Sequence, residues 1–416
     1  MRPIILTAPA TALYAAILED LKLGFMEHGC PCAWLHYPLH SHDVSGHQSE
    51  LGRVAQQHNA QAVFEINRAL SDQTEWPSEV AHFTWIQDHR FSDRGDLLGD
   101  LGRSDHTYLI TDPRGFGIPP LPSDRSWSIL LPGANAGSPA DMTSHEPERD
   151  FAFMGYISPP LELDRPAAQK ANFDVISLRA VLERFPKDVL MQSRNPPGAI
   201  RSALAATLAE LECIAISDDL VRVFDETLPR TIERRSLIEQ ILSVSQSVDL
   251  FGPPEWKEWP QFAAHYRRMV NDRAELATLY RTTRVNLHNG ALAMHYRVLE
   301  CLSLGTFVMV NATPLDNLPG GIKNYLEPGR HYGEYDLTEA ASVGRQYLEN
   351  AEARKRIASE GQRAVIGAHT WAHRAAQILD DLNVLNRIKR QSPDRDDVSR
   401  VAAATQSSIA GSSRMR

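Results

Sequence analysis

The chain has 416 residues, of which 43% are hydrophobic and 23% are charged, a globular composition with enough apolar side chains for a large core. At roughly 150 residues per domain, this length predicts two or three domains. The formal net charge of −9 argues against nucleic acid or an anionic membrane surface as the main partner. No apolar run approaches the roughly 20 residues that a membrane helix needs, so we expect no integral membrane segment.

The four cysteines, Cys30, Cys32, Cys213 and Cys301, supply no zinc tetrad. Cys30 and Cys32 are separated by one residue, which is too close for an unstrained disulfide within a strand. We therefore expect core thiols in a reducing compartment, and a cytoplasmic protein. The N-terminal stretch carries acidic residues early, and we expect it to form a buried strand and a helix and not a signal peptide.

Short apolar segments alternate with helical segments over the first 150 residues. The predicted strands are 3–9, 32–37, 60–66, 81–88, 106–112 and 126–134, and the clearest predicted helices are 10–29 and 49–59. This alternation predicts a parallel sheet that is covered by helices on both faces. Ligands of such sheets bind beyond the carboxyl ends of the strands, which here lead into the loops Thr7–Thr11, Asn67–Arg68, Asp88–Arg90 and Asp112–Arg114.

A second α/β region follows a linker rich in Gly, Pro, Ser and acidic residues at 133–150. Its predicted strands are 150–160, 247–252, 285–289 and 306–311. Its predicted helices include 275–284, 291–305 and 352–390. The segment 173–246 has mostly helical periodicity. The last 25 or so residues are polar with small side chains and are predicted to be disordered. We therefore expect a first Rossmann-like domain at 1–140, a second at 151–380, and a helix end with a disordered tail at 381–416.

The predicted fold class is α/β, with two Rossmann-like domains that face each other across a cleft. A helical insertion in the second domain and a closing C-terminal helix complete the GT-B architecture. This fold alone does not settle function, because two-domain α/β proteins also include sugar-binding proteins and epimerases.

The segment VNLHNGALAMHYRVLECLSLGTFVMVN, residues 285–311, is similar to the donor-site segment of bacterial GT-B glycosyltransferases of the CgeB-like, group 1-like family. The match covers Asn286, Leu287, Met294, His295, Arg297, Glu300, Gly305 and Phe307. Residues 324–336 and 352–379 also resemble elements of that family. The resemblance is strong over residues 150–380 and weak over residues 1–150. It implies that residues 151–380 form the nucleotide-sugar donor domain and residues 1–140 the acceptor domain. It implies a hexosyltransferase-like enzyme of bacterial glycan biosynthesis that uses a nucleotide-diphosphate sugar as donor and needs no further cofactor.

The loop His288, Asn289 and Gly290 leads into the N-terminus of the predicted helix, where free N–H groups and the helix dipole suit a diphosphate. Arg297 or His295 could add positive charge against the phosphates. The resemblance implies that Glu300 accepts hydrogen bonds from the ribose hydroxyls. The alternative is a plain Arg297–Glu300 pair on a solvated helix face.

Two further glycines, Gly155 and Gly252, follow predicted strands of the second domain and occupy turns near the expected donor side. The resemblance suggests that their backbone contacts the nucleotide, although turn geometry alone could require a glycine at both positions. Many retaining GT-B enzymes carry a glutamate eight residues before the one matched by Glu300, and this chain has Leu292 there. Retention of stereochemistry is therefore unsupported.

An inverting enzyme of this fold needs a base on the first domain, and Asp88 or His89 follows a predicted strand at a suitable place. Asp88 could instead cap the following turn, and Asp112 occupies the equivalent position after the next strand. No Asp-x-Asp motif stands at a convincing strand end, so no metal ligand is expected and the chemistry is predicted to be metal-independent.

The sequence thus favours a glycosyltransferase that joins a nucleotide sugar to an unknown acceptor, which could be a saccharide, a lipid-linked glycan, a protein or a small molecule. Two alternatives stay open. One is a nucleotide-sugar epimerase of the same fold, and the other is a noncatalytic protein that binds nucleotide sugars or glycans or serves in assembly.

Overall fold

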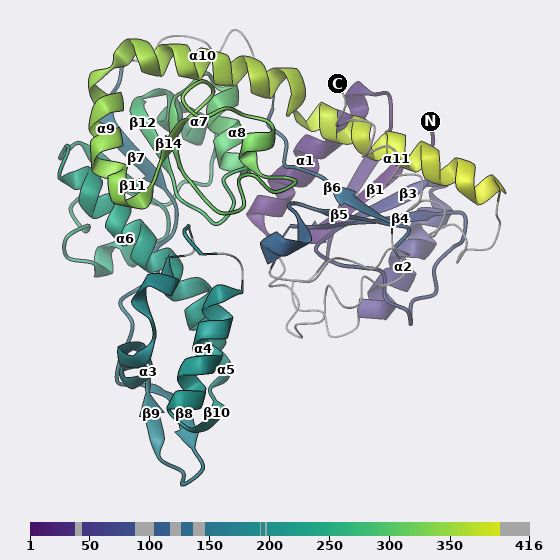
Figure 1. The fold of residues 1–416 in the computed structure, drawn as a ribbon. Helices are drawn as coiled ribbons and strands as arrows, with labels where there is room; N and C mark the ends of the chain where they lie inside the picture. Colours follow the sequence, from purple (N-terminus) through teal and green to yellow (C-terminus); the bar gives the residue numbers. More distant parts are fainter. Residues whose placement is uncertain are drawn as a thin grey trace. The chain divides into compact units, whose positions relative to one another are not determined.

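The computed structural model describes residues 1–37, 44–87, 104–116, 126–135, 146–191, 193–195 and 198–391. The chain divides into two compact units, one of residues 1–135 with 366–416 and the other of residues 136–365 (Figure 1). The predicted donor domain extended to residue 380, whereas the last helix, α11 (Trp371–Gln391), packs on α1 of the first unit. Among the described residues, no helix is long and apolar enough to span a bilayer.

The first unit is built on a six-stranded parallel sheet with the order β2-β1-β3-β4-β5-β6. Its strands are β1 (Ile4–Pro9), β2 (Cys32–Tyr37), β3 (Ala62–Ile66), β4 (Ala81–Ile86), β5 (His106–Leu109) and β6 (Trp127–Ile129). One face packs against α1 (Ala12–Glu27) and α11, and the other against α2 (Val44–Gln57). The central strands β1, β3 and β4 are buried along their whole length, as their continuous apolar runs predict.

The second unit has a five-stranded parallel sheet with the order β11-β7-β12-β13-β14. Its strands are β7 (Arg149–Met154), β11 (Val248–Phe251), β12 (Thr283–His288), β13 (Val308–Asn311) and β14 (Gly333–Tyr335). Its helices are α6 (Leu228–Leu242), α7 (Arg273–Arg281), α8 (Tyr296–Ser303), α9 (Ala340–Glu349) and α10 (Ala351–Ala368). Alternate residues of β7 point to opposite faces, so Phe151 and Phe153 pack with α6, α9 and α10 while Ala152 packs with α7.

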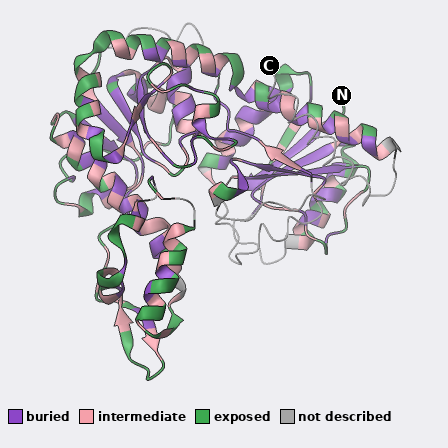
Figure 2. Ribbon diagram, in the orientation of Figure 1, coloured by how far each residue is buried: buried purple, intermediate pink, exposed green. Residues whose placement is uncertain are grey.

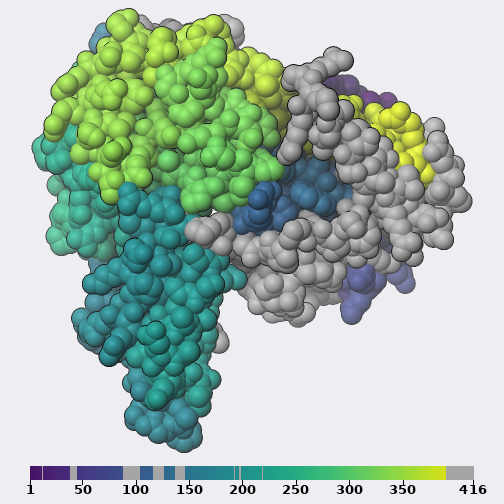
Figure 3. All heavy atoms as spheres, viewed as in Figure 1, coloured from purple at the N-terminus to yellow at the C-terminus, as the bar shows by residue number. Residues whose placement is uncertain are grey.

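The segment between β7 and α6 forms an insertion that differs from the helical segment predicted for 173–246. It contains a three-stranded antiparallel sheet, β8 (Pro166–Lys170), β9 (Val175–Ser177) and β10 (Cys213–Ile216), with the helices α3 (Leu178–Arg184), α4 (Ala199–Glu210) and α5 (Asp218–Arg222) and a π-helical turn at Val223–Thr227. Figure 2 shows much of its surface exposed, and it projects from the rest of the second unit as the teal region of Figure 3. The strands escaped prediction because β10 is largely exposed and continues the apolar spacing of α4.

The remaining short elements are 3-10 turns at Pro113–Phe116, Lys187–Leu190, Pro254–Glu258, Ile322–Asn324 and Leu337–Glu339. The α/β fold class, with two Rossmann-like units, an insertion in the second and a C-terminal helix that returns to the first, is confirmed.

Candidate functional site

The carboxyl ends of the parallel strands β7, β12 and β13 meet at one edge of the second sheet, where the predicted donor loop follows β12. Asn311, the last residue of β13, holds this loop by both groups of its carboxamide. Its Oδ1 accepts from the Gly290 N–H at 3.0 Å, and its Nδ2 donates to the Gly290 carbonyl at 2.9 Å. The Gly290 N–H is therefore already bonded within the protein, and the close approach of phosphate to this loop stays a prediction. The sequence reasoning missed Asn311, although its place at a strand end was a usable signal.

The predicted helix 291–305 begins only at Tyr296, because His295 is its N-cap and residues 291–295 form bends. The His295 Nδ1 accepts from the Arg297 N–H at 3.2 Å, and its carbonyl accepts from Val298 and Leu299. Ala293 and Met294 are buried within the bends, which explains why the apolar spacing resembled a longer helix. The helix N-terminus thus lies one and a half turns later than predicted and is capped by a side chain.

Two arginines supply the positive charge at this edge. Arg234 comes from α6, and its guanidinium donates to the carbonyls of Tyr156 and, at 3.1 Å, of Asn289. Arg297 on α8 donates to the Met154 carbonyl at 2.7 Å. Over the described part of the chain, neither guanidinium has a carboxylate within 4.0 Å, and the buried Nε of Arg234 has no hydrogen-bond partner. The intrahelical Arg297–Glu300 pair, the alternative interpretation, is therefore not formed.

The electrostatics at this edge are dominated by positive charge around Arg234. Burial, together with the neighbouring charges of Arg230 and Arg297, holds the pKa of Arg234 well below its usual range. The nearby Glu233 carboxylate offsets part of the repulsion on Arg234, and an anion bound among the arginines would relieve more of it. The sequence reasoning missed both Arg230 and Arg234, because their stretch RTIERRSLIEQ has the composition of an ordinary solvated helix.

The two histidines of the predicted site, His288 and His295, are uncharged. Their ring centroids lie 5.0 Å apart. Burial lowers the pKa of His288 to about 3, with help from the Arg297 and Arg234 charges, and burial likewise holds the pKa of His295 well below its usual range. Both rings are neutral near pH 7, so His295 does not add the positive charge expected of it. The His288 Nε2 is buried and makes no hydrogen bond of good geometry, although the nearby Leu292 backbone slightly opposes the lowering of the pKa.

Glu300 lies one turn after Arg297 on α8, and its Oε1 accepts from Arg273 of α7 at 3.4 Å. The Glu300 side chain is 21% exposed and that of Arg273 is 42% exposed. The carboxylate is therefore partly reachable, but it already shares its charge with one guanidinium.

The glycines Gly155 and Gly252 are explained by packing. The φ of Gly252 is +149°, and a Cβ there would lie 2.1 Å from the Gly155 carbonyl oxygen. The same carbonyl accepts from the indole N–H of Trp256 at 2.8 Å, and Trp256 is fully buried. A Cβ on Gly155 would lie 2.6 Å from the Phe153 Cε1, so packing accounts for both glycines, and a nucleotide contact at either stays a prediction.

In the first unit, the candidate bases Asp88 and His89 lie outside the described residues. Asp112 is described, and its carboxylate accepts from the Arg114 side chain at 2.8 and 3.0 Å. These hydrogen bonds hold the pKa of Asp112 below its usual range, so it is a poor base.

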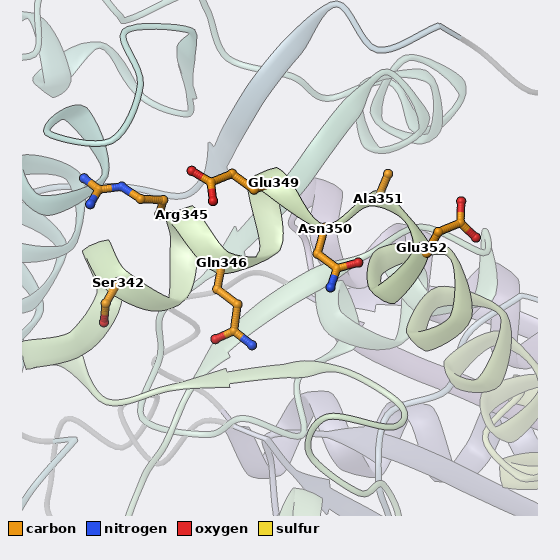
Figure 4. Close-up of a pocket in the computed structure, with 7 residues that line it drawn as sticks. All are labelled: Ser342, Arg345, Gln346, Glu349, Asn350, Ala351 and Glu352. Carbon is orange, nitrogen blue, oxygen red and sulfur yellow. The ribbon is translucent and has the colours of Figure 1, made fainter.

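A hollow of about 750 Å³ lies at the junction of α9 and α10 (Figure 4). It is lined by Ser342, Arg345, Gln346, Glu349, Asn350, Ala351 and Glu352. The charges of Arg284 and Asp150 influence the pKa of Arg354, which follows the lining residues on α10. Arg284 and Asp150 lie at the amino ends of β12 and β7. The hollow is therefore remote from the carboxyl edge and separate from the candidate site. Among the described residues, no group of three or more His, Cys, Asp or Glu side chains could hold a metal ion.

Comparison with known proteins gives an independent view of the second unit. The glycosyl transferase-like family model matches residues 230–380, which include Arg234, the donor loop and α8. Residues 230–380 are similar to glycosyltransferases. No curated protein matches the sequence significantly.

Two solved structures align with most of the chain at low sequence identity. WaaG, a glycosyltransferase involved in lipopolysaccharide biosynthesis, is 13% identical with a TM-score of 0.47, and the alignment covers 90% of this chain and 99% of WaaG. The spinosyn forosaminyltransferase SpnP is 10% identical with a TM-score of 0.44, covering 92% of this chain and 99% of SpnP. Likenesses this distant assign no substrate.

Proposed function

We propose that the protein is a glycosyltransferase that moves a sugar from a nucleotide-diphosphate sugar, bound by the second unit, to an acceptor bound by the first. The observation that carries this proposal is the pair of guanidiniums of Arg234 and Arg297, which converge at the carboxyl edge of the sheet without a described carboxylate partner. A diphosphate is the common biological anion that suits two planar, charged donors. The similarity of residues 230–380 to glycosyltransferases supports the choice of chemistry.

Each group then has a physical task. Arg234 and Arg297 would bind the diphosphate and stabilise the charge that develops on it as the glycosidic bond breaks, which requires no metal ion. Glu300 would accept hydrogen bonds from the ribose hydroxyls, a match of carboxylate and diol. Leu292 offers no carboxylate to the sugar, so the stereochemical course stays open. Asp88 or His89 remains our prediction for the base, and a hexose donor and a role in bacterial glycan biosynthesis in the cytoplasm complete the proposal.

The test of the donor site is a series that adds one phosphate at a time. Uridine, UMP and UDP, and the corresponding thymidine series, are titrated calorimetrically at 50 and 300 mM salt. We expect affinity to rise about tenfold or more with each phosphate, because hydrogen bonds to charged groups are strong, and to fall with salt. Equal affinity along the series, or no binding of any diphosphate, would contradict the proposal.

The products formed from nucleotide sugars distinguish a glycosyltransferase from an epimerase and from a noncatalytic protein. UDP- and dTDP-sugars are incubated with the protein and analysed by mass spectrometry and by NMR. Release of free sugar and nucleotide diphosphate, the slow hydrolysis typical of a transferase without acceptor, is the expected result. An epimerised donor would identify an epimerase, and binding without any conversion, with or without a library of glycan acceptors, would favour a noncatalytic protein.

A further inference from the structure

The most constrained polar group near the two arginines is the carboxylate of Glu233, which precedes Arg234 on α6 and is fully buried. Its Oε1 accepts from the Ser193 N–H at 2.7 Å, and its Oε2 accepts from the Asn289 Nδ2 at 3.2 Å. Burial raises the pKa of Glu233, whereas these hydrogen bonds and the Arg234 charge oppose the rise. A buried carboxylate requires such partners.

The contact with Glu233 fixes the orientation of the Asn289 carboxamide. The opposite orientation would place the Asn289 Oδ1 against a carboxylate oxygen, with no donor between two acceptors. The main chain is held as well, because the Asn289 carbonyl accepts from Arg234 at 3.1 Å. Asn289 is 2% exposed, so neither rotation nor withdrawal into solvent is open to it.

The consequence is an acceptor atom that nothing in the protein satisfies. The Asn289 Oδ1 is buried and has no hydrogen-bond partner. The Nε2 of the adjacent His288 is also buried and makes no hydrogen bond of good geometry, although it lies near the Leu292 backbone. Buried polar atoms without partners are rare in folded proteins, and each calls for an explanation. Here two such atoms lie on successive residues, beside two arginines that have no described carboxylate partner. This arrangement indicates a place where a ligand supplies the missing hydrogen bonds.

We propose that Glu233 is a positioning residue that presents the Asn289 Oδ1 to a hydroxyl group of the donor sugar. A carbonyl oxygen repels phosphate oxygens, so it does not suit the diphosphate itself. It suits a hydrogen-bond donor that is attached next to the diphosphate, and the hydroxyls of the transferred sugar are in that position. This inference rests on the proposed function, and it assigns recognition of the sugar to residues other than the arginines.

The competing explanation is that Glu233 only ties the loop at Ser193 to α6. The substitution Glu233→Gln separates the two roles. A glutamine can still accept from the Ser193 N–H, but its amide N–H₂ would face Asn289 and turn the Asn289 carboxamide over. The double variant Glu233→Gln with Asn289→Asp restores an acceptor oxygen at position 289 while conserving the total charge.

The measurement is the ratio of two affinities, that for a nucleotide-diphosphate sugar and that for the nucleotide diphosphate alone. The probes are the pairs UDP-glucose with UDP, UDP-N-acetylglucosamine with UDP, and dTDP-glucose with dTDP. We expect Glu233→Gln to reduce this ratio about tenfold for the best pair, as the loss of one buried hydrogen bond predicts, with little change in the affinity for the diphosphate. The double variant should regain most of the ratio. Glu65→Gln, the same substitution at a fully buried carboxylate of the first unit, is the matched control and should leave the ratio unchanged.

Each outcome has a distinct meaning. If the unmodified protein binds no nucleotide diphosphate, the proposed function fails and this inference falls with it. If it binds the diphosphate but Glu233→Gln leaves the ratio unchanged, the inference is overturned and the proposed function stands. If Glu233→Gln lowers the ratio and the double variant does not restore it, Glu233 is structural only, and the inference is again overturned.

Discussion

The charged side chains near the carboxyl edges of the two sheets differ in whether they have partners of opposite charge. In the first unit, the buried Glu65 lies 3.1 Å from the His82 Nε2 and 3.9 Å from the Arg68 Nε, and Asp112 pairs with Arg114. In the second unit, Arg234 and Arg297 donate to main-chain carbonyls and have no described carboxylate partner. Over the described residues, the first edge pairs its acids with bases of its own, although the Glu65 Oε1 and the Arg68 Nη1 are buried without a hydrogen-bond partner. The second edge leaves two guanidiniums without a carboxylate within 4.0 Å.

The largest expected effect comes from breaking the pairs of opposite charge in the first unit. Glu65→Ala removes the acceptor for Gln48 and His82 and leaves Arg68 without its carboxylate. Because the removal of one partner strands buried polar groups, we expect a loss of about 3 kcal/mol in the free energy of unfolding. Hydrogen exchange followed by mass spectrometry should localise the loss to residues 44–87.

The matched control is Glu50→Ala, at an exposed carboxylate that pairs with Arg53. Surface pairs contribute little, so this variant should resemble the parent protein. An unchanged stability of Glu65→Ala would contradict the description of the first edge as one whose acids pair with bases of its own.

The second edge is tested by Arg234→Met. We expect the affinity for UDP or dTDP to fall about 100-fold, because an arginine that binds phosphate directly is lost. The free protein should keep its stability or gain some, since burying a guanidinium without a carboxylate is itself costly. Calorimetry and thermal unfolding measure the two quantities.

Arg235→Met is the control for this variant, since Arg235 is the next residue of α6 and pairs at the surface with Glu239. Its nucleotide affinity should match that of the unmodified protein. A similar loss in both variants would indicate a general effect of charge on the protein and not a specific site.

The smallest expected effect is on the pH dependence of stability in acid. Burial lowers the pKa of His106, a residue of the first unit, to about 3, and its ring nitrogens lie 2.6 and 2.9 Å from the Ser126 and Ser128 hydroxyls. Between pH 6.5 and about 3 the unfolded chain binds a proton that the folded chain does not, so stability falls as the pH decreases in that window. His106→Asn should reduce the slope by about 1.4 kcal/mol per pH unit between pH 4 and 6, measured by urea unfolding. His58→Asn, at an exposed position, is the control, and an equal change in both variants would refute the assignment.

The sequence predicted the sheets well and the site in part. Continuous apolar runs such as IILTAP and TFVMVN identify strands that are buried on both faces, and they were placed within a few residues. The loop of His288, Asn289 and Gly290 was also placed correctly at the end of β12, and its role in binding the donor stays a prediction. The short strands β8 to β10 were missed because an antiparallel sheet with exposed positions gives no strong alternation, as Ile214 at 70% exposure illustrates.

The arrangement of the charges could not be predicted, because it depends on contacts between distant segments. Arg234 and Arg297 are 63 residues apart in the sequence, and nothing local distinguishes Arg234 from the exposed Arg235 beside it. The start of α8 was misplaced because the His295 cap competes with a good apolar spacing. Residues 392–416, predicted to be disordered, lie outside the described residues, as do Asp88 and His89.

The return of α11 to the first unit has a consequence for the order in which the protein is made. Side chains of α11, among them Trp371 and Ile378, belong to the same core as Leu6 and Phe64. The first unit is therefore encoded in two pieces, with the whole of the second unit between them. A ribosome finishes residues 136–365 while the sheet of the first unit still lacks α11, which together with α1 covers one of its faces. The second unit can thus fold during synthesis, whereas the first, although its sheet is translated earlier, must complete its core last.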